Sequence, residues 1–319
     1  MIMEKLVILT GPTAVGKTKI SIELAKALNG EIISADSMQV YRDMNIGTDK
    51  ITDEAMQGIK HHLIDILDPS EEFNAFEFKK RAKELITDIN NRGKLPIIVG
   101  GTGFYIQTVL YDVDFSENTE DAEIIKYKNE LTEISKSPDG VHRLHEMLKE
   151  IDPEYAGDLH ENNIKRVIRA LSFYKETGTR LSEHNKDQRD KQSPYDFFYF
   201  VLTDERSVLY DRIEKRIDKM MDEGLLEEVK GLAARNIDRQ STSMQAIGYK
   251  EIFSYLDGEN SLEEAVALLK KNTRHFAKRQ ITWFKREKDV TWIDKSEFNR
   301  DDIKVSKELI KRIKDRWEI

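Results

Sequence analysis

A glycine-rich stretch near the N-terminus constrains the fold of this chain more than any other feature. Residues 11–18 read GPTAVGKT and fit the pattern G-x-x-x-x-G-K-[S/T] at every position. Residues 6–9 before it form an apolar run typical of a buried parallel strand. After it, apolar residues from Ile20 to Leu28 recur with helical spacing. Strand, glycine loop and helix in this order are the context that the motif requires. The sequence therefore predicts a site for a di- or triphosphate.

Each part of this loop has a physical role in holding phosphate. Glycines let the backbone approach the ligand closely, and successive N–H groups and the helix N-terminus then point at the anion. Lys17 adds a point charge, and the hydroxyl of Thr18 can hold Mg²⁺. The loop is thus expected to bind a nucleotide such as ATP, or another di- or triphosphate, with Mg²⁺ as the cofactor. The predicted diphosphate-binding residues are Gly11, Pro12, Thr13, Ala14, Val15, Gly16, Lys17 and Thr18.

Composition narrows the class of protein. The 319 residues are 39% hydrophobic and 34% charged, and none is cysteine, which excludes disulfides, cysteine nucleophiles and Cys-ligated zinc. No apolar run approaches the roughly 20 residues that span a membrane. The charged Glu4 and Lys5 beside a short apolar run do not fit a signal peptide. We therefore expect a cytoplasmic protein, and a monomer.

One segment departs from the acidic character of the chain. Residues 270–288 hold eight basic residues and one acid, so their charge of +7 leaves −15 for the rest of a chain whose net charge is −8. The segment lies in a predicted helix from Leu262 to about Lys288, and aromatic residues are interleaved with its charges. Such a run is either a directed patch for a polyanion or a solvated helix face.

Two further strands are expected to deliver polar residues beside the phosphate loop. Residues 31–35 predict a strand that ends at Asp36, and residues 95–99 predict one that ends in Gly100-Gly101-Thr102. Ligands of doubly wound sheets lie outside the carboxyl ends of the strands. Asp36 is therefore a candidate for chemistry, or alternatively a turn cap. The second strand lacks the Asp that usually holds Mg²⁺ in P-loop ATPases and GTPases.

The remaining elements predict an α/β fold: a P-loop NTPase-like parallel sheet flanked by helices, with an all-helical insertion domain. Residues 61–69 are interpreted as a third strand ended by a Pro turn, and residues 197–202 as the strand that resumes the sheet. Between the two, strand-like runs disappear after about residue 111 and polar helical segments such as 120–136 follow. We therefore expect residues 1–111 and 195–319 to form the core and residues 112–194 the insertion.

The order of these motifs resembles the tRNA dimethylallyltransferase (tRNA isopentenyltransferase) family, in its bacterial form without a zinc finger. The similarity is spread over nearly the whole chain. The stretches that carry it are the phosphate loop, residues 34–41 (SADSMQVY), 43–48 (DMNIGT), 99–105 (VGGTGFY), 166–171 (RVIRAL), 247–249 (IGY) and 277–283 (AKRQITW).

This resemblance implies a reaction and a set of roles. The family transfers a dimethylallyl group from dimethylallyl diphosphate to N6 of adenosine 37, beside the anticodon of certain tRNAs. Asp36 then matches the base that takes a proton from N6, and Arg216, Lys17 and the loop amides stabilise the departing diphosphate. Thr102 matches a position that helps to hold the diphosphate or the base. The implied catalytic residues are Asp36, Thr18, Thr102 and Arg216, with Thr18 as the metal ligand.

The implied RNA partner is the anticodon stem-loop. Its target base must leave the stack, and single-stranded loops favour aromatic and arginine stacking together with phosphate contacts. The residues expected to contact tRNA are Asp36, Ser37, Met38, Gln39, Lys165, Arg166, Arg169, Gly248, Tyr249, Lys250, Arg274, Lys278, Arg279, Gln280 and Trp283.

Two other functions remain open at this point. Prenylation of a free adenine nucleotide would need neither a helical insertion nor a basic segment. A P-loop kinase or nucleotide-switch RNA-binding protein would need a metal-binding Asp after the strand of residues 95–99, where glycines and Thr102 stand instead.

Overall fold

The computed structural model describes residues 3–113 and 122–318, and its contacts divide the chain into two compact units. The first unit comprises residues 1–110 and 194–319, and the second comprises residues 111–193. The second unit therefore begins and ends one residue before the insertion that was expected at residues 112–194. Glu120, the expected start of its first helix, lies outside the described residues.

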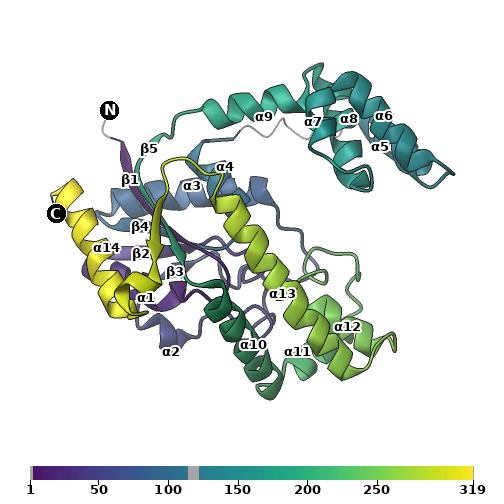
Figure 1. Cartoon of the computed structure of the whole chain (residues 1–319). Helices are drawn as coiled ribbons and strands as arrows, with labels where there is room; N and C mark the ends of the chain where they lie inside the picture. Colours follow the sequence, from purple (N-terminus) through teal and green to yellow (C-terminus); the bar gives the residue numbers. More distant parts are fainter. Residues whose placement is uncertain (1–2, 114–121, 319) are drawn as a thin grey trace. The chain divides into compact units, whose positions relative to one another are not determined.

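A parallel sheet forms the centre of the first unit (Figure 1), which confirms the predicted α/β class. Its spatial order is β3-β2-β4-β1-β5-β6, and all neighbours pair in parallel. β1, which leads into the phosphate loop, is therefore central, and the carboxyl ends of all strands meet at one edge. The strands are β1 (Glu4–Thr10), β2 (Gly30–Ser34), β3 (His61–His62), β4 (Leu95–Gly100), β5 (Tyr195–Thr203) and β6 (Thr291–Asp294).

Helices cover both faces of this sheet. Apolar residues of α1 and α14, among them Leu24 and Leu309, form one buried core with Val7 and Phe200 of the sheet. α3 and α4 pack together on the opposite face (Figure 1). No helix of the described chain is both long and apolar enough to cross a bilayer. The helices are α1 (Lys17–Ala27), α2 (Asp53–Met56), α3 (Ala75–Asn91), α4 (Gly103–Leu110), α10 (Arg206–Asp222), α11 (Leu225–Ala233), α12 (Tyr249–Leu256), α13 (Leu262–Phe284), the 3₁₀ helix η1 (Lys295–Phe298) and α14 (Asp302–Trp317).

The third strand is much shorter than predicted. Only two residues of the expected strand 61–69 pair in the sheet, because Leu63 and Asp65 adopt left-handed backbone conformations with φ of 62° and 54°. The amides of Ile66 and Leu67 instead donate to the carbonyl oxygen of Val40 at 2.9 and 3.1 Å. The apolar pattern reports burial of Leu63 and Leu67 here, but the backbone that buries them is irregular.

The basic helix also ends earlier than predicted. α13 stops at Phe284, so Lys285 and Arg286 follow the helix. Its start is well defined, since Ser261 and Glu264 form a capping box in which each side chain accepts the other residue's amide N–H. A further helix, α11, follows Gly224.

The second unit is helical and has its own core. Leu144 and Leu148 of α6 pack against Val167 and Leu171 of α8, and Leu131 of α5 joins them. The helices are α5 (Ala122–Ser135), α6 (Gly140–Ile151), α7 (Pro153–Gly157), α8 (Ile164–Thr177) and α9 (Leu181–Asp190).

Candidate active site

The phosphate loop joins β1 to α1 and is closed on itself by Lys17. The Lys17 ammonium donates hydrogen bonds to the carbonyl oxygens of Gly11 and Pro12 at 3.0 and 2.9 Å. Burial lowers the pKa of this amine to about 8; the Asp36 carboxylate opposes the shift, and the nearby Arg216 cation adds to it. The amine is therefore held under the loop, close to both a catalytic candidate and a second cation.

Asp36 lies two residues after the end of β2, one residue further from the strand than the sequence predicted. Its Oδ1 accepts hydrogen bonds from the amides of Met38 and Gln39 at 2.9 and 3.3 Å, which makes it a turn cap as well as a catalytic candidate. Both bonds end at Oδ1, so Oδ2 is the oxygen that can accept a proton from a ligand. The cap fixes the orientation of the carboxylate.

The carboxyl ends of β2 and β4 approach each other closely beside Asp36. A Cβ at Gly100 would lie 2.2 Å from the carbonyl oxygen of Ala35, so no larger residue fits there. That same oxygen accepts the amide N–H of Thr102 at 3.2 Å. The glycines after β4 thus serve close packing of two strand ends, and they bring Thr102 next to Asp36.

Arg216 reaches the phosphate loop from α10. Its guanidinium donates to Oγ1 of Thr13 at 2.7 Å and to the Asp49 carboxylate at 3.0 Å. A salt bridge with an exposed carboxylate is weak by itself, but here it orients a half-buried cation. Asp49 is a site residue that the sequence analysis missed.

Gln280 and Trp283 of α13 pack against the loops of the site. The Gln280 carbonyl accepts the Thr13 amide at 2.9 Å, and its amide group donates to the Gly101 carbonyl at 3.0 Å. Gln280 is 6% exposed, so it bridges the phosphate loop and the turn after β4. This corrects the expectation that Gln280 contacts RNA: both ends of its amide are bonded inside the protein. Trp283 lies over Gly103, where an added Cβ would be 2.2 Å from the indole ring.

A half-buried hydrogen-bond clamp holds the loop that carries Asp49. The Glu228 carboxylate of α11 accepts the amides of Asn45, Ile46 and Gly47 at 2.8 to 3.0 Å, and the hydroxyl of Tyr249 at 2.6 Å. Burial and the adjacent Glu228 charge raise the pKa of Tyr249, which stays a neutral donor.

This clamp corrects two of the predicted RNA contacts. Tyr249 is 0% exposed and Gly248 is buried, so both belong to the support of the site instead. Lys250, the next residue along, is exposed.

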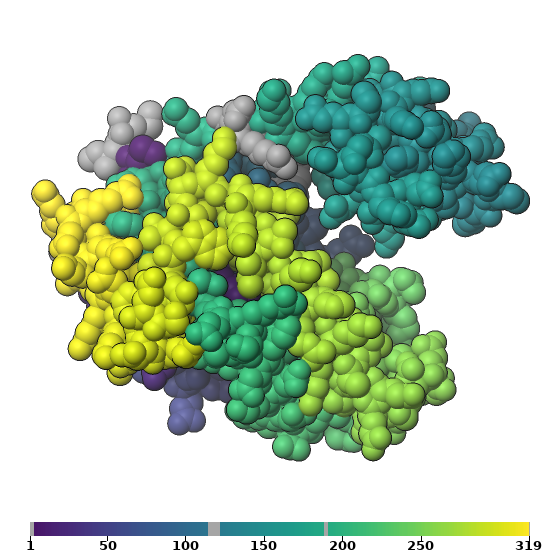
Figure 2. Space-filling view, viewed as in Figure 1, coloured from purple at the N-terminus to yellow at the C-terminus, as the bar shows by residue number. Residues whose placement is uncertain are grey.

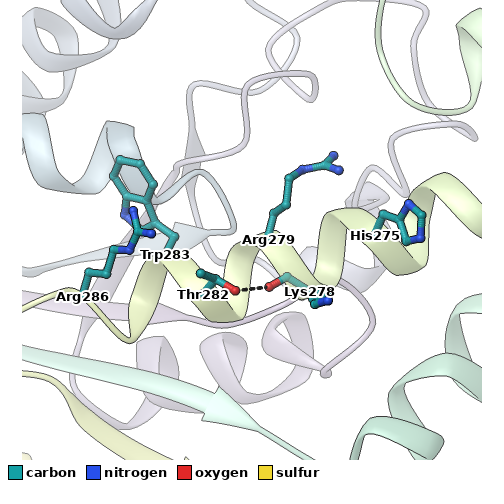
Figure 3. A pocket seen from close by; sticks show the side chains of 6 residues that line it. All are labelled: His275, Lys278, Arg279, Thr282, Trp283 and Arg286. Atoms are coloured by element: carbon teal, nitrogen blue, oxygen red, sulfur yellow. Dashed lines mark hydrogen bonds between the residues drawn. The ribbon is translucent and has the colours of Figure 1, made fainter. Parts of the chain in front are cut away.

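The outer face of α13 carries exposed basic residues. In Figure 2 this helix, in yellow-green, runs as a ridge beside α10. Lys278 and Arg279 are exposed on it, whereas Arg274 is half-buried and pairs with Glu214 of α10 at 2.6 Å. Figure 3 shows the shallow pocket, of about 410 Å³, that this face forms near Trp283. Its lining residues are His275, Lys278, Arg279, Thr282, Trp283 and Arg286.

The other expected RNA contacts lie in two places. Ser37, Met38 and Gln39 are half-buried in the turn that Asp36 caps. Lys165, Arg166 and Arg169 are exposed on α8, in the second unit.

A metal ion would have one candidate protein ligand here. Thr18 is exposed at the first turn of α1, and its hydroxyl is a hard oxygen donor of the kind that Mg²⁺ prefers. Among the described residues, no three His, Cys, Asp or Glu side chains gather as a metal site. The donor set therefore fits an ion held mainly by ligand oxygens and water, not an all-protein cage.

Comparison with known proteins identifies the family. Residues 39–287 match the sequence profile of the IPP transferase family (IPPT), which is more than half of the chain. The chain belongs to the IPP transferase family. It is 58% identical over 299 residues to the tRNA dimethylallyltransferase of Lachnoclostridium phytofermentans, covering 94% of each chain. Identity to the tRNA dimethylallyltransferase of Bacillus cereus strain AH187 is 53% over 291 residues, covering 91% of this chain and 90% of the relative.

Solved structures of IPP transferases have the same fold. The tRNA isopentenylpyrophosphate transferase of Bacillus halodurans is 48% identical with a TM-score of 0.73, over 99% of this chain and 98% of that one. A eukaryotic dimethylallyltransferase acting on tRNA is 31% identical with a TM-score of 0.78, over 96% of this chain and 78% of that one. The architecture of this chain is thus shared with solved structures of the family.

Proposed function

We propose that this chain transfers a dimethylallyl group from dimethylallyl diphosphate to N6 of adenosine 37 in tRNA, and releases diphosphate. The observation that carries the proposal is the set of residues beside the phosphate loop, which includes Asp36 and Thr102. After β4 the chain has Thr102, where an ATPase would have an Asp that binds the metal. This set of residues suits a substrate whose diphosphate is the leaving group, because transfer to an amine does not require an activated water. The names and coverage of the relatives support the same reaction.

The residues around the loop suit the two halves of the transfer. The exocyclic amine of adenine is a poor nucleophile, and it loses a proton as its nitrogen bonds to the prenyl C1. Oδ2 of Asp36 is the proposed acceptor of that proton. As the bond between C1 and the diphosphate oxygen breaks, the leaving group takes the electron pair. Lys17, Arg216 and the loop amides stabilise the resulting charge, and Thr102 helps to hold the diphosphate.

Mg²⁺ is the proposed cofactor. Thr18 would hold it beside the diphosphate, and when bound it would neutralise charge on the leaving group. The protein's own part is to place Lys17 and Arg216 on the remaining phosphate oxygens, where fixed cations cost no reorganisation.

The RNA partner is proposed to be the anticodon stem-loop. Its target base has to leave the stack to reach Asp36, and Trp283 and Arg279 near the basic pocket are side chains on which unstacked bases pack well. Lys278 and Lys250 offer exposed charges to phosphates, as do Lys165, Arg166 and Arg169. We further propose that the protein acts as a cytoplasmic monomer, which light scattering at working concentration would check.

One labelling experiment tests the reaction. The protein is incubated with labelled dimethylallyl diphosphate and either tRNA, AMP or ATP alone. Label in tRNA, mapped to adenosine 37, is the expected result. Label in AMP would favour prenylation of free nucleotides, and ATP hydrolysis without transfer would favour the kinase or switch class. Either of those results would overturn the proposal.

A further inference from the structure

A buried lysine from the C-terminal part of the chain forms a hydrogen bond with the backbone of the phosphate loop. The side chain of Lys295, at the start of η1, is 3% exposed. Its ammonium donates a hydrogen bond to the carbonyl oxygen of Val15 at 2.9 Å and pairs with Asp302 at 2.5 Å. Lysine is almost never buried to this extent unless it is paired. A charged side chain 280 residues away therefore holds one specific peptide of the loop.

The geometry of that peptide gives the contact a consequence for the ligand. Peptide bonds of the described residues are all trans, so the Val15 carbonyl and the Gly16 N–H point in opposite directions. Lys295 holds the Val15 carbonyl oxygen, so the Gly16 N–H on the same peptide points away from Lys295. Phosphate loops bind their anion with such successive N–H groups. Lys295 thus fixes the direction of a donor that it does not itself touch.

The contact with Lys295 leaves no room for a side chain at Gly16. Its φ of 93° lies in the left-handed region, and an added Cβ would be 2.8 Å from the Lys295 nitrogen. The second glycine of the motif therefore makes room for the buried ammonium as well as for the backbone turn.

The partner carboxylate anchors the tether to the core. Asp302 begins α14, whose Val305 and Leu309 pack in the same buried core as Ile20 and Leu24 of α1. Because Asp302 neutralises the ammonium, the pair adds little net charge to the site. Its effect on the loop is therefore one of geometry more than of electrostatic attraction.

We propose that Lys295 is a positioning residue that, with Asp302, sets the diphosphate affinity of the loop by orienting the Gly16 N–H. This inference deepens the proposed function and rests on it for the identity of the substrate. The binding of inorganic pyrophosphate tests the tether by itself. The C-terminal segment of the chain thereby takes part in the site without contacting any substrate.

The test compares Lys295→Met with a matched control, Arg300→Met. Arg300 lies on the same segment, and its guanidinium pairs with the buried Asp204 and with Glu205, each at 3.0 Å. Calorimetry measures the affinity for inorganic pyrophosphate, and steady-state kinetics measures KM for dimethylallyl diphosphate and for tRNA. We expect Lys295→Met to weaken pyrophosphate binding about tenfold, the size of one lost charged hydrogen bond. KM for dimethylallyl diphosphate should rise by the same factor, and KM for tRNA should not change. Lys295→Arg should restore part of the lost pyrophosphate affinity.

A second variant keeps the test decisive if the first one does not fold. Lys295→Met combined with Asp302→Asn removes both charges from the interior, so no buried charge is left unpaired, and the same tenfold loss is expected. Pyrophosphate affinities equal to that of Arg300→Met would reduce Lys295 to a structural residue and overturn the inference. A wild type that binds pyrophosphate but does not modify tRNA would break the proposed function alone, and one that binds no pyrophosphate would overturn both.

Discussion

Cations around the phosphate loop and cations on the outer face of α13 are held in opposite ways. Lys17 and Arg216 are bonded to the loop itself, at distances of 2.7 to 3.0 Å. Lys278 and Arg279 stand exposed on α13. Fixed cations suit a small ligand whose charge develops at one place. Exposed cations suit a polyanion, which gains by releasing counterions from many phosphates. We therefore propose that the first region binds the diphosphate and the second binds RNA.

The largest effect is expected at the proposed base, Asp36. Asp36→Asn should reduce turnover by about 10²–10⁴, the range for a general base, while pyrophosphate binding persists. Single-turnover transfer of label to tRNA measures it. Asp43→Asn is the control, because Asp43 is an exposed carboxylate that pairs with Arg235 at 2.9 Å. A near-normal single-turnover rate in Asp36→Asn would remove it from proton transfer.

Lys17 should give the loop a pH dependence. The pKa of Lys17 is about 8, below the ordinary value for lysine. In the protein without ligand, the Lys17 amine is therefore mostly charged below pH 8 and mostly neutral above it. Diphosphate binding favours the charged form, so affinity contributed by Lys17 should fall as pH rises through about 8. The ratio of pyrophosphate affinities, wild type over Lys17→Met, isolates this group from the ligand's own titration. A ratio that stays constant from pH 6.5 to 9.5 would contradict the lowered pKa.

The clamp behind Arg216 should give a smaller effect. Glu228→Gln leaves the amides of residues 45–47 with a poorer acceptor, and we expect a loss of about 1–3 kcal/mol in the free energy of unfolding. Turnover should fall about tenfold because Asp49 no longer holds Arg216 in place. Glu227→Gln is the matched control, since Glu227 is exposed on the same helix and pairs with Lys230. Equal losses in the two variants would deny the clamp its role.

The proposed metal ligand, Thr18, should give the smallest effect. Thr18→Ala removes one oxygen donor from an ion that is otherwise held by ligand and water, so the Mg²⁺ midpoint of activity should rise about threefold, and Thr18→Ser should restore it. Activity titrated against Mg²⁺ measures both. An unchanged midpoint in Thr18→Ala would exclude this hydroxyl from metal binding.

Sequence patterns predicted the sheet and the loop because their signals are local. The strand before the loop and the helix after it are fixed by neighbouring residues, and Asp36 follows from its place at a strand end. Lys295 and Glu228 were not predicted, because each bonds to a backbone group that is far away in the sequence. The spacing of residues in the sequence does not reveal such contacts.

The expected RNA contacts show a different limit. Resemblance places Gln280 in a motif but does not say which way its side chain points. Gln280 continues the buried stripe of α13 through Thr273, Ala277 and Phe284, and that helical spacing would have revealed it as internal. Arg274 lies beside that stripe and is bonded to Glu214, so it is a weaker candidate than Arg279 for contact with RNA.

The salt dependence of binding tests the division between the two regions most directly. Affinities for the anticodon stem-loop and for pyrophosphate are measured at several salt concentrations, for the wild type, for Lys278→Gln with Arg279→Gln, and for Arg274→Gln. The account predicts that the double variant weakens RNA binding and flattens its logarithmic salt slope by about 0.7 to 0.9 for each lost phosphate contact, while its pyrophosphate affinity is unchanged. Arg274→Gln should leave the slope as it is, because that guanidinium already pairs with Glu214. Identical RNA slopes in the wild type and the double variant would show that the outer face of α13 is only solvated, and would contradict the account.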